Sequence, residues 1–137
     1  METLVLDASI TMTWCYPDEN SDYAYRVLDA LDQAHALVPS LWAIEIANAV
    51  VVGERRKRLT AADTAQFFEL LRGLAIETDM LTASRALGDT LQLARAHGLS
   101  AYDASYLELA MRERVVLATL DERLKNAAHA VGVTIFS

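Results

Sequence analysis

The feature that most constrains the fold is the alternation of short apolar runs with longer segments of helical periodicity. The apolar runs predict strands at 3–6, 37–39, 75–77, 115–119 and 133–136. The segments between them predict helices at 7–15, 21–36, 41–56, 60–74, 81–97, 101–112 and 121–130. Strands that alternate with helices indicate an α/β sandwich with a largely parallel sheet, in which functional sites form at the carboxyl ends of the strands.

Length and composition fit one globular domain. The chain has 137 residues, of which 53% are hydrophobic, and no Pro/Gly-rich linker interrupts it, so we expect a single domain spanning 1–137. Neither a signal peptide nor an apolar run long enough to span a membrane is evident. The lone Cys15 cannot form an internal disulfide. We therefore expect a cytoplasmic protein that makes no membrane contact.

The charge balance limits how the chain could bind a nucleic acid. A net charge of −7 argues against broad electrostatic binding of a phosphate backbone, which favours basic surfaces. One basic run, Arg55, Arg56 and Lys57, is a candidate RNA contact. The alternative is a solvated helix end, where positive side chains interact favourably with the helix dipole.

Two acids directly follow predicted strands. Asp7 comes after the run 4–6, and Asp121 lies two residues beyond Thr119. If the strands are parallel, both carboxylates lie at the same edge of the sheet, where a site would form. The alternative is local: Asp121 is well placed to cap its helix and Asp7 to open a turn.

The other two acids of interest lie inside predicted helices. Glu45 is, with Asn48, one of only two polar residues in the segment 41–52, and a helix apolar on all sides is expected to be buried. A buried carboxylate requires a metal, a proton or a cation, and the alternative to a functional site is an arginine ion pair. Asp103 follows Ser100 at the spacing of a capping box, which is a strong structural alternative.

Together the four acids suggest a carboxylate metal site. Mg²⁺, or Mn²⁺ in its place, is held by carboxylates, waters and phosphates without cysteine or histidine. One or two such ions could activate water for attack on a phosphodiester. Ser9, Asn48 and Thr119 could orient these carboxylates or contact the phosphate, or could only satisfy local backbone groups. Trp42 and Tyr106 are predicted to be core residues.

Four motifs, in this order, resemble those of the PIN-domain nucleases and specifically the VapC toxins: VLDAS (5–9), PSLWAIEIAN (39–48), LSAYDASYLELA (99–110) and LATLDERL (117–124). The resemblance extends from Leu4 to Ile135. It implies a three-layer α/β sandwich with a five-stranded, mostly parallel sheet flanked by helices. It also implies a Mg²⁺- or Mn²⁺-dependent endoribonuclease that is a homodimer and is inhibited by a VapB-like antitoxin. Asp7, Glu45, Asp103 and Asp121 match the metal-binding acids of that family.

Two other functions remain possible from the sequence. The pattern Asp7-x-Ser9-x-Thr11 nearly fits the nucleophile motif of haloacid-dehalogenase-like phosphoryl-transfer enzymes, but Ser9 replaces the second aspartate. A catalytically silent PIN-like module that binds a protein partner is also consistent with the negative charge. No Gly-rich phosphate loop or Ser/His/Asp arrangement supports nucleotide hydrolysis or acyl transfer.

Overall fold

Four parallel strands form the central sheet of the computed structural model, which describes residues 2–137. They are β1 (Glu2–Leu6), β2 (Ala34–Val38), β3 (Ile76–Thr78) and β4 (Val116–Ala118), in the order β3-β2-β1-β4. The chain therefore proceeds from β1 to one side of the sheet and returns to the other side of β1 with β4. In open α/β sheets, ligands bind where the strand order reverses in this way, here between the ends of β1 and β4.

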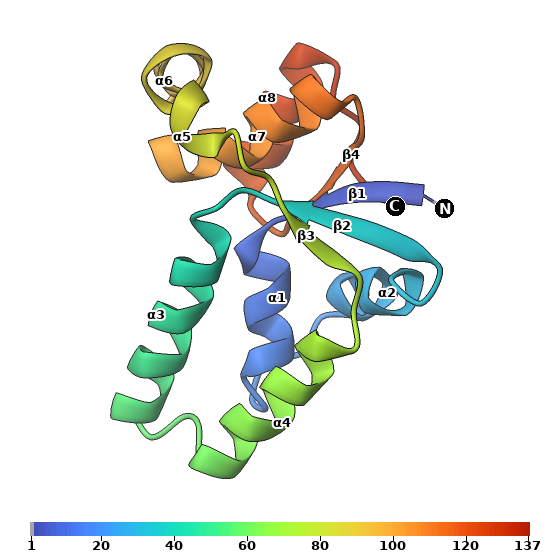
Figure 1. The fold of residues 1–137 in the computed structure, drawn as a ribbon, viewed down its shortest axis with the longest axis vertical. Helices are drawn as coiled ribbons and strands as arrows, with labels where there is room; N and C mark the ends of the chain where they lie inside the picture. Colours follow the sequence, from blue (N-terminus) through green and yellow to red (C-terminus); the bar gives the residue numbers. More distant parts are fainter. Residues whose placement is uncertain (1) are drawn as a thin grey trace.

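Helices cover both faces of the sheet. Their bounds are α1 (Ala8–Cys15), α2 (Asp22–Ala30), α3 (Trp42–Arg55), α4 (Ala61–Arg72), α5 (Thr82–Arg85), the π-helical turn η1 (Ala86–Thr90), α6 (Leu91–His97), α7 (Ala101–Glu113) and α8 (Glu122–Val131). Figure 1 shows α1 to α4 on one side of the strands and α5 to α8 on the other. The expected three-layer α/β sandwich with a parallel sheet is confirmed.

Local signals in the sequence set several helix ends. Thr60 and Asp63 form a complete capping box at the start of α4. Ser100 accepts a hydrogen bond from the Asp103 amide at the start of α7. Gly98 ends α6 with φ of 64°, a left-handed conformation that glycine adopts without a steric penalty.

Two expectations about the elements are wrong. The predicted helix 21–36 ends at Ala30, and β2 already begins at Ala34, because Ala34 and Ala36 face the core as alternating strand residues although alanine favours helices. The predicted fifth strand, 133–136, is reduced to one bridge between Leu117 and Ile135 in the part of the chain that the structure describes. The physical reason is that its neighbour β4 has only three residues.

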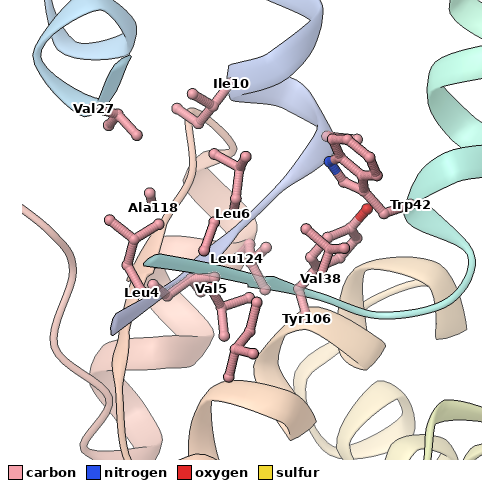
Figure 2. Packing of buried hydrophobic residues seen from close by; sticks show 14 of the residues in the cluster. Leu4, Val5, Leu6, Ile10, Val27, Val38, Trp42, Tyr106, Ala118 and Leu124 are labelled. Atoms are coloured by element: carbon pink, nitrogen blue, oxygen red, sulfur yellow. The ribbon is translucent and has the colours of Figure 1, made fainter. Parts of the chain in front are cut away.

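The core lies on both faces of β1 and β2. Leu4, Leu6, Val38 and Tyr106 are among its fully buried side chains, and Figure 2 shows them packed with Trp42 beside the strands. Trp42 and Tyr106 are thus core residues, as predicted. Between residues 2 and 137, no helix combines the length and the apolar character that crossing a membrane requires.

Candidate functional site

The ends of β1 and β4 bring Asp7 and Thr119 together. The parallel register pairs Leu6 with Ala118, so the next residue of each strand lies at the same level of the sheet edge. The Asp7 amide donates to the Ala118 carbonyl at 3.0 Å, and the Thr119 hydroxyl donates to Asp7 Oδ2 at 2.6 Å. Two residues that are 112 positions apart thus form the base of the candidate site.

Hydroxyl groups fix the carboxylate of Asp7. Ser9 Oγ also donates to Oδ2, at 2.8 Å, and itself accepts from the amide of Leu120 at 3.1 Å. Thr119 Oγ1 in turn accepts from the Asp121 amide at 3.0 Å. The network therefore joins the β1–α1 and β4–α8 connections. Among residues 2–137, no side chain donates to Oδ1 of Asp7.

Asp7 does not act as a helix cap. It occupies the N-cap position of α1, but its side chain makes no capping hydrogen bond. The carboxylate is instead almost fully buried, with 4% of the residue exposed. The turn-residue alternative does not explain such a buried side chain.

Glu45 lies on α3 and reaches α7. Its Oε1 accepts a hydrogen bond of 2.5 Å from the hydroxyl of Tyr106. The expectation that α3 is buried on all sides is wrong: Ile44 is 73% exposed, and Glu45 is half-buried at the edge of the buried face. The reason is that α3 packs the face with Trp42, Ile46 and Val50 into the core, mainly against α1, and leaves its other face exposed.

The remaining two acids begin α7 and α8. Asp121 is the N-cap of α8, and its Oδ1 accepts from the Leu124 amide at 3.0 Å, so the capping alternative is confirmed for one of its oxygens. The Asp103 amide donates a hydrogen bond to the Ser100 hydroxyl, and Ser100 also lowers the pKa of Asp103, although burial and Asp121 raise it overall. The Asp103 carboxylate accepts no hydrogen bond from the Ser100 backbone amide in the described residues, whereas Asp63 accepts one from the Thr60 amide in the complete box of α4. It is therefore not committed to closing a capping box.

The four carboxylates interact electrostatically without a compensating cation. Burial raises the pKa of Asp7, and the charges of Asp103 and Asp121 raise it further against the lowering effect of its hydroxyl partners. Burial likewise raises the pKa of Glu45, with contributions from Asp7 and Asp103, and that of Asp103, with a contribution from Asp121. Within residues 2–137 none of the four forms an ion pair. The arginine partner considered for Glu45 is thus absent.

This donor set fits a hard divalent cation in its chemistry. All four groups are carboxylates, and those of Asp7, Glu45 and Asp121 each have one anchored oxygen and one without a side-chain donor. As the side chains stand, no three His, Cys, Asp or Glu residues in the described chain are close enough to hold one ion. The carboxylates raise one another's pKa, and a bound cation would offset this repulsion.

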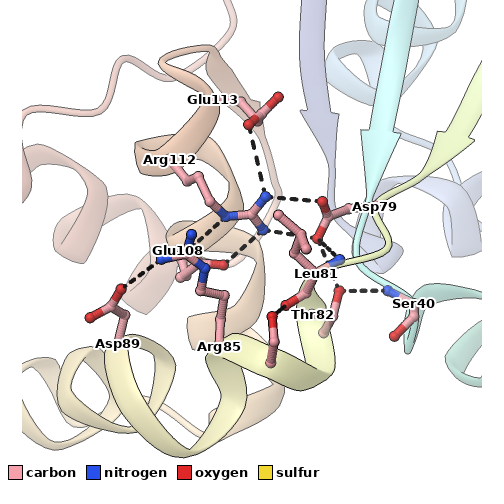
Figure 3. A network of polar contacts seen from close by, with 10 residues as sticks. Ser40, Asp79, Leu81, Thr82, Arg85, Asp89, Glu108, Arg112 and Glu113 are labelled. Carbon is pink, nitrogen blue, oxygen red and sulfur yellow. Dashed lines mark hydrogen bonds and ion pairs between the residues drawn. The ribbon is translucent and has the colours of Figure 1, made fainter.

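A fifth acid at the same sheet edge is neutralised. Asp79 follows β3, and both of its oxygens accept from Arg112, at 3.0 and 2.8 Å (Figure 3). Arg112 also holds Glu108, and it lowers the pKa of Asp79. A cavity of about 500 Å³ adjoins this network between α5–α6 and α7, but none of the four acids lines it. Its charged groups pair with one another, so we place the site at the four acids.

Of the other predicted site residues, only some lie at the acids. Ser9 and Thr119 donate hydrogen bonds to Asp7, whereas Asn48 is exposed and makes no side-chain hydrogen bond in the described part of the chain. The run 55–57 lies at the far end of α3, ten residues and therefore about 15 Å along the axis from Glu45. The structure does not bring it to the acids. The Tyr106 hydroxyl was missed, because the sequence indicates a core residue but not which side chain it contacts.

Comparison with known proteins gives consistent relatives. The family model described as PIN domain matches residues 4–130. Ribonuclease VapC3 of Pyrobaculum aerophilum is 32% identical over 121 residues, which cover 88% of this chain and 91% of the relative. Ribonuclease VapC9 of Mycobacterium tuberculosis is 34% identical over 127 residues, 93% of this chain and 92% of the relative.

Solved structures share the fold at lower identity. VapBC2 from Rickettsia felis, solved bound to a DNA fragment from its promoter, matches with a TM-score of 0.69 and 14% identity, over 98% of this chain and 97% of that one. FitAcB from Neisseria gonorrhoeae matches with a TM-score of 0.62 and 19% identity, over 98% and 96%. At these identities the likeness concerns the fold alone.

Proposed function

Because this chain belongs to the PIN domain family, we propose that it is a metal-dependent endoribonuclease that hydrolyses phosphodiester bonds of RNA. The observation that carries the proposal is that four carboxylates from four separate segments of the chain interact electrostatically, while none of them forms an ion pair with a cationic side chain in residues 2–137. A structural role would favour an ion pair such as the one at Asp79, because uncompensated buried charge is costly.

In this proposal Asp7, Glu45, Asp103 and Asp121 hold one or two Mg²⁺ ions, or Mn²⁺ as a substitute. Bound ions of this kind supply Lewis-acid polarisation of the phosphate and activation of water. Ser9 and Thr119 keep the Asp7 carboxylate in place from one side, so that its other oxygen is available to a ligand. The basic run 55–57 stays a prediction for contact with RNA beyond the reacting phosphate.

We further propose that the chain is the toxin component of a toxin–antitoxin pair, with a VapB-like antitoxin as partner, a homodimeric state and a cytoplasmic location. Its support is the similarity, over most of its length, to proteins named VapC ribonucleases. The negative charge of the chain also suits a partner with a basic segment.

Cleavage of labelled single-stranded RNA tests the enzymatic proposal. We expect cleavage with Mg²⁺ or Mn²⁺ and none with excess EDTA. Asp7→Asn and Asp103→Asn should each lower the rate by more than about 100-fold, since loss of even a supporting group at a metal site costs about 10- to 100-fold. Asp32→Asn, at an exposed turn after α2, is the matched control and should cleave normally.

Two results would contradict this proposal. Full activity of both site variants would exclude the four acids as the catalytic centre. A wild-type chain that binds the ions but cleaves no RNA would favour the silent PIN-like module instead. Circular dichroism of each variant separates loss of activity from loss of fold.

A further inference from the structure

Tyr106 combines deep burial with a polar contact to the candidate site. The residue is 0% exposed, and its ring packs in the core, yet its hydroxyl reaches Glu45 Oε1 at 2.5 Å. Figure 2 shows the ring beside Val38 with its oxygen directed toward the start of α3, where Trp42 lies. A phenylalanine would fill the same space, so packing alone does not explain the hydroxyl.

The hydroxyl is the only side-chain donor to Glu45 in residues 2–137. It engages one carboxylate oxygen and leaves Oε2 without a side-chain donor. It also adds no charge, so the negative charge of Glu45 is kept. Both consequences are useful for a group that must bind a cation.

The pair of Asp79 and Arg112 in the same protein shows how a carboxylate is held when its role is structural. Arg112 engages both oxygens of Asp79 and neutralises that carboxylate. Bidentate arginine contacts of this kind hold a carboxylate firmly but leave it little capacity for another ligand. Tyr106 holds Glu45 by one oxygen only, as Ser9 and Thr119 hold Asp7 by one oxygen only.

The position of Tyr106 on α7 links two of the four acids. It follows Asp103 by three residues, so the two side chains lie on the same side of the helix. The helix thus carries Asp103 itself and, through the Tyr106 hydroxyl, fixes the Glu45 side chain of α3. A free glutamate side chain would have to lose rotamer freedom when a ligand binds.

We propose that Tyr106 is a positioning residue that holds the Glu45 carboxylate in the orientation needed for divalent-ion binding. The inference rests on the proposed function, because it assigns Glu45 to the metal site. It predicts that the hydroxyl matters for ion affinity through Glu45, and that the aromatic ring matters for the core.

Calorimetric titration with Mn²⁺ alone, without RNA, tests the inference. Tyr106→Phe should bind Mn²⁺ about 10- to 100-fold more weakly than the wild type, the range expected for loss of a group that orients a ligand. The matched control is Tyr16→Phe. Tyr16 is buried and donates to the Ala49 carbonyl of the same helix α3 at 2.6 Å, so this variant also loses a hydroxyl contact to α3 but not at Glu45. It should bind Mn²⁺ normally.

A double-mutant cycle establishes whether Tyr106 acts through Glu45. In a Glu45→Gln background, Tyr106→Phe should cause no further loss of Mn²⁺ affinity, because coupled residues are not additive. Equal binding by wild type and Tyr106→Phe, equal losses in Tyr106→Phe and Tyr16→Phe, or additive losses in the cycle would each overturn the inference while leaving the proposed function intact. A wild-type chain that binds no Mn²⁺ would overturn both.

Discussion

At the scale of single residues, the hydrogen-bond partner of each acid distinguishes the acids of the candidate site from the acids that stabilise the fold. Asp79 and Glu108 pair with Arg112, whereas the side-chain donors to Asp7 and Glu45 in residues 2–137 are all hydroxyl groups. Hydroxyl donors stabilise a carboxylate less than a guanidinium does, so burial dominates and the pKa values of Asp7 and Glu45 are raised. The uncompensated acids therefore destabilise the metal-free fold at neutral pH.

This imbalance predicts a pH dependence of stability without divalent ions. The pKa values of Asp7, Glu45 and Asp103 are raised in the folded state, so above their ordinary values of 3.8 to 4.5 the folded chain binds more protons than the unfolded chain. The free energy of unfolding then falls as pH rises from about 4 toward neutrality. The lowered pKa of Asp79 acts in the opposite sense, but below 3.8.

Thermal melts in EDTA measure the effect. The wild type should melt at a higher temperature at pH 5 than at pH 7.5, and Asp7→Asn should reduce the difference and raise the melting temperature at pH 7.5. A wild-type melting temperature that stays constant or rises over this range, with Asp7→Asn unchanged from it, would contradict the assignment of raised pKa values.

At the scale of elements, α7 is fixed to the sheet edge by the network of Figure 3. Arg112 of α7 binds Asp79 after β3, and Asp79 also accepts from Thr82 at the start of α5. The Thr82 hydroxyl in turn accepts from the Ser40 amide, just before α3. Ser40 contributes its backbone amide to this connection, and the N-cap position of α3 is Leu41. The network sets α7, which carries Asp103, relative to α3, which carries Glu45.

Arg112→Met should therefore be strongly destabilising. It would leave Asp79 and Glu108, both largely buried, without their cation, and loss of one partner from such a buried pair costs about 3–5 kcal/mol. Urea unfolding at pH 7 measures the change. Arg85→Met breaks the more exposed pair with Asp89 and should cost less than about 1 kcal/mol. If the two variants lost a similar free energy of unfolding, the Arg112 network would stabilise the fold no more than an exposed ion pair does.

At the scale of the whole molecule, the strand order and the net charge act together. The reversal at β1 places Asp7 beside the β4–α8 connection, and the helices that follow add the remaining acids. These interacting acids belong to a chain whose net charge is already −7. A net negative charge attracts cations and basic segments at long range, an attraction that salt screens.

Binding of the proposed antitoxin should consequently depend on ionic strength. We expect the association rate with a cognate antitoxin to fall steeply as salt rises from 50 to 500 mM, because charge complementarity acts mainly on the encounter. Surface plasmon resonance at several salt concentrations measures it. An association rate independent of salt would show that the negative charge plays no part, even if the partner binds.

The sequence by itself determined the alternation of strands and helices, the caps at Ser100 and Asp121, and the choice of the four acids as candidates. These features depend on local periodicity, on turn chemistry and on short motifs, which neighbouring residues specify. The sequence did not determine that β2 begins at Ala34, because an alanine-rich segment satisfies helix and strand patterns alike.

Only the tertiary structure decided what each acid contacts. It separated Asp7, whose side chain caps nothing, from Asp121, which caps α8, and it showed Glu45 at the edge of a helix with an exposed face. It also showed that the Tyr106 hydroxyl donates to Glu45, 61 positions away, and that Arg112 pairs with Asp79. Such pairings depend on how helices pack on the two faces of the sheet, and no local pattern along the chain specifies that distance or direction.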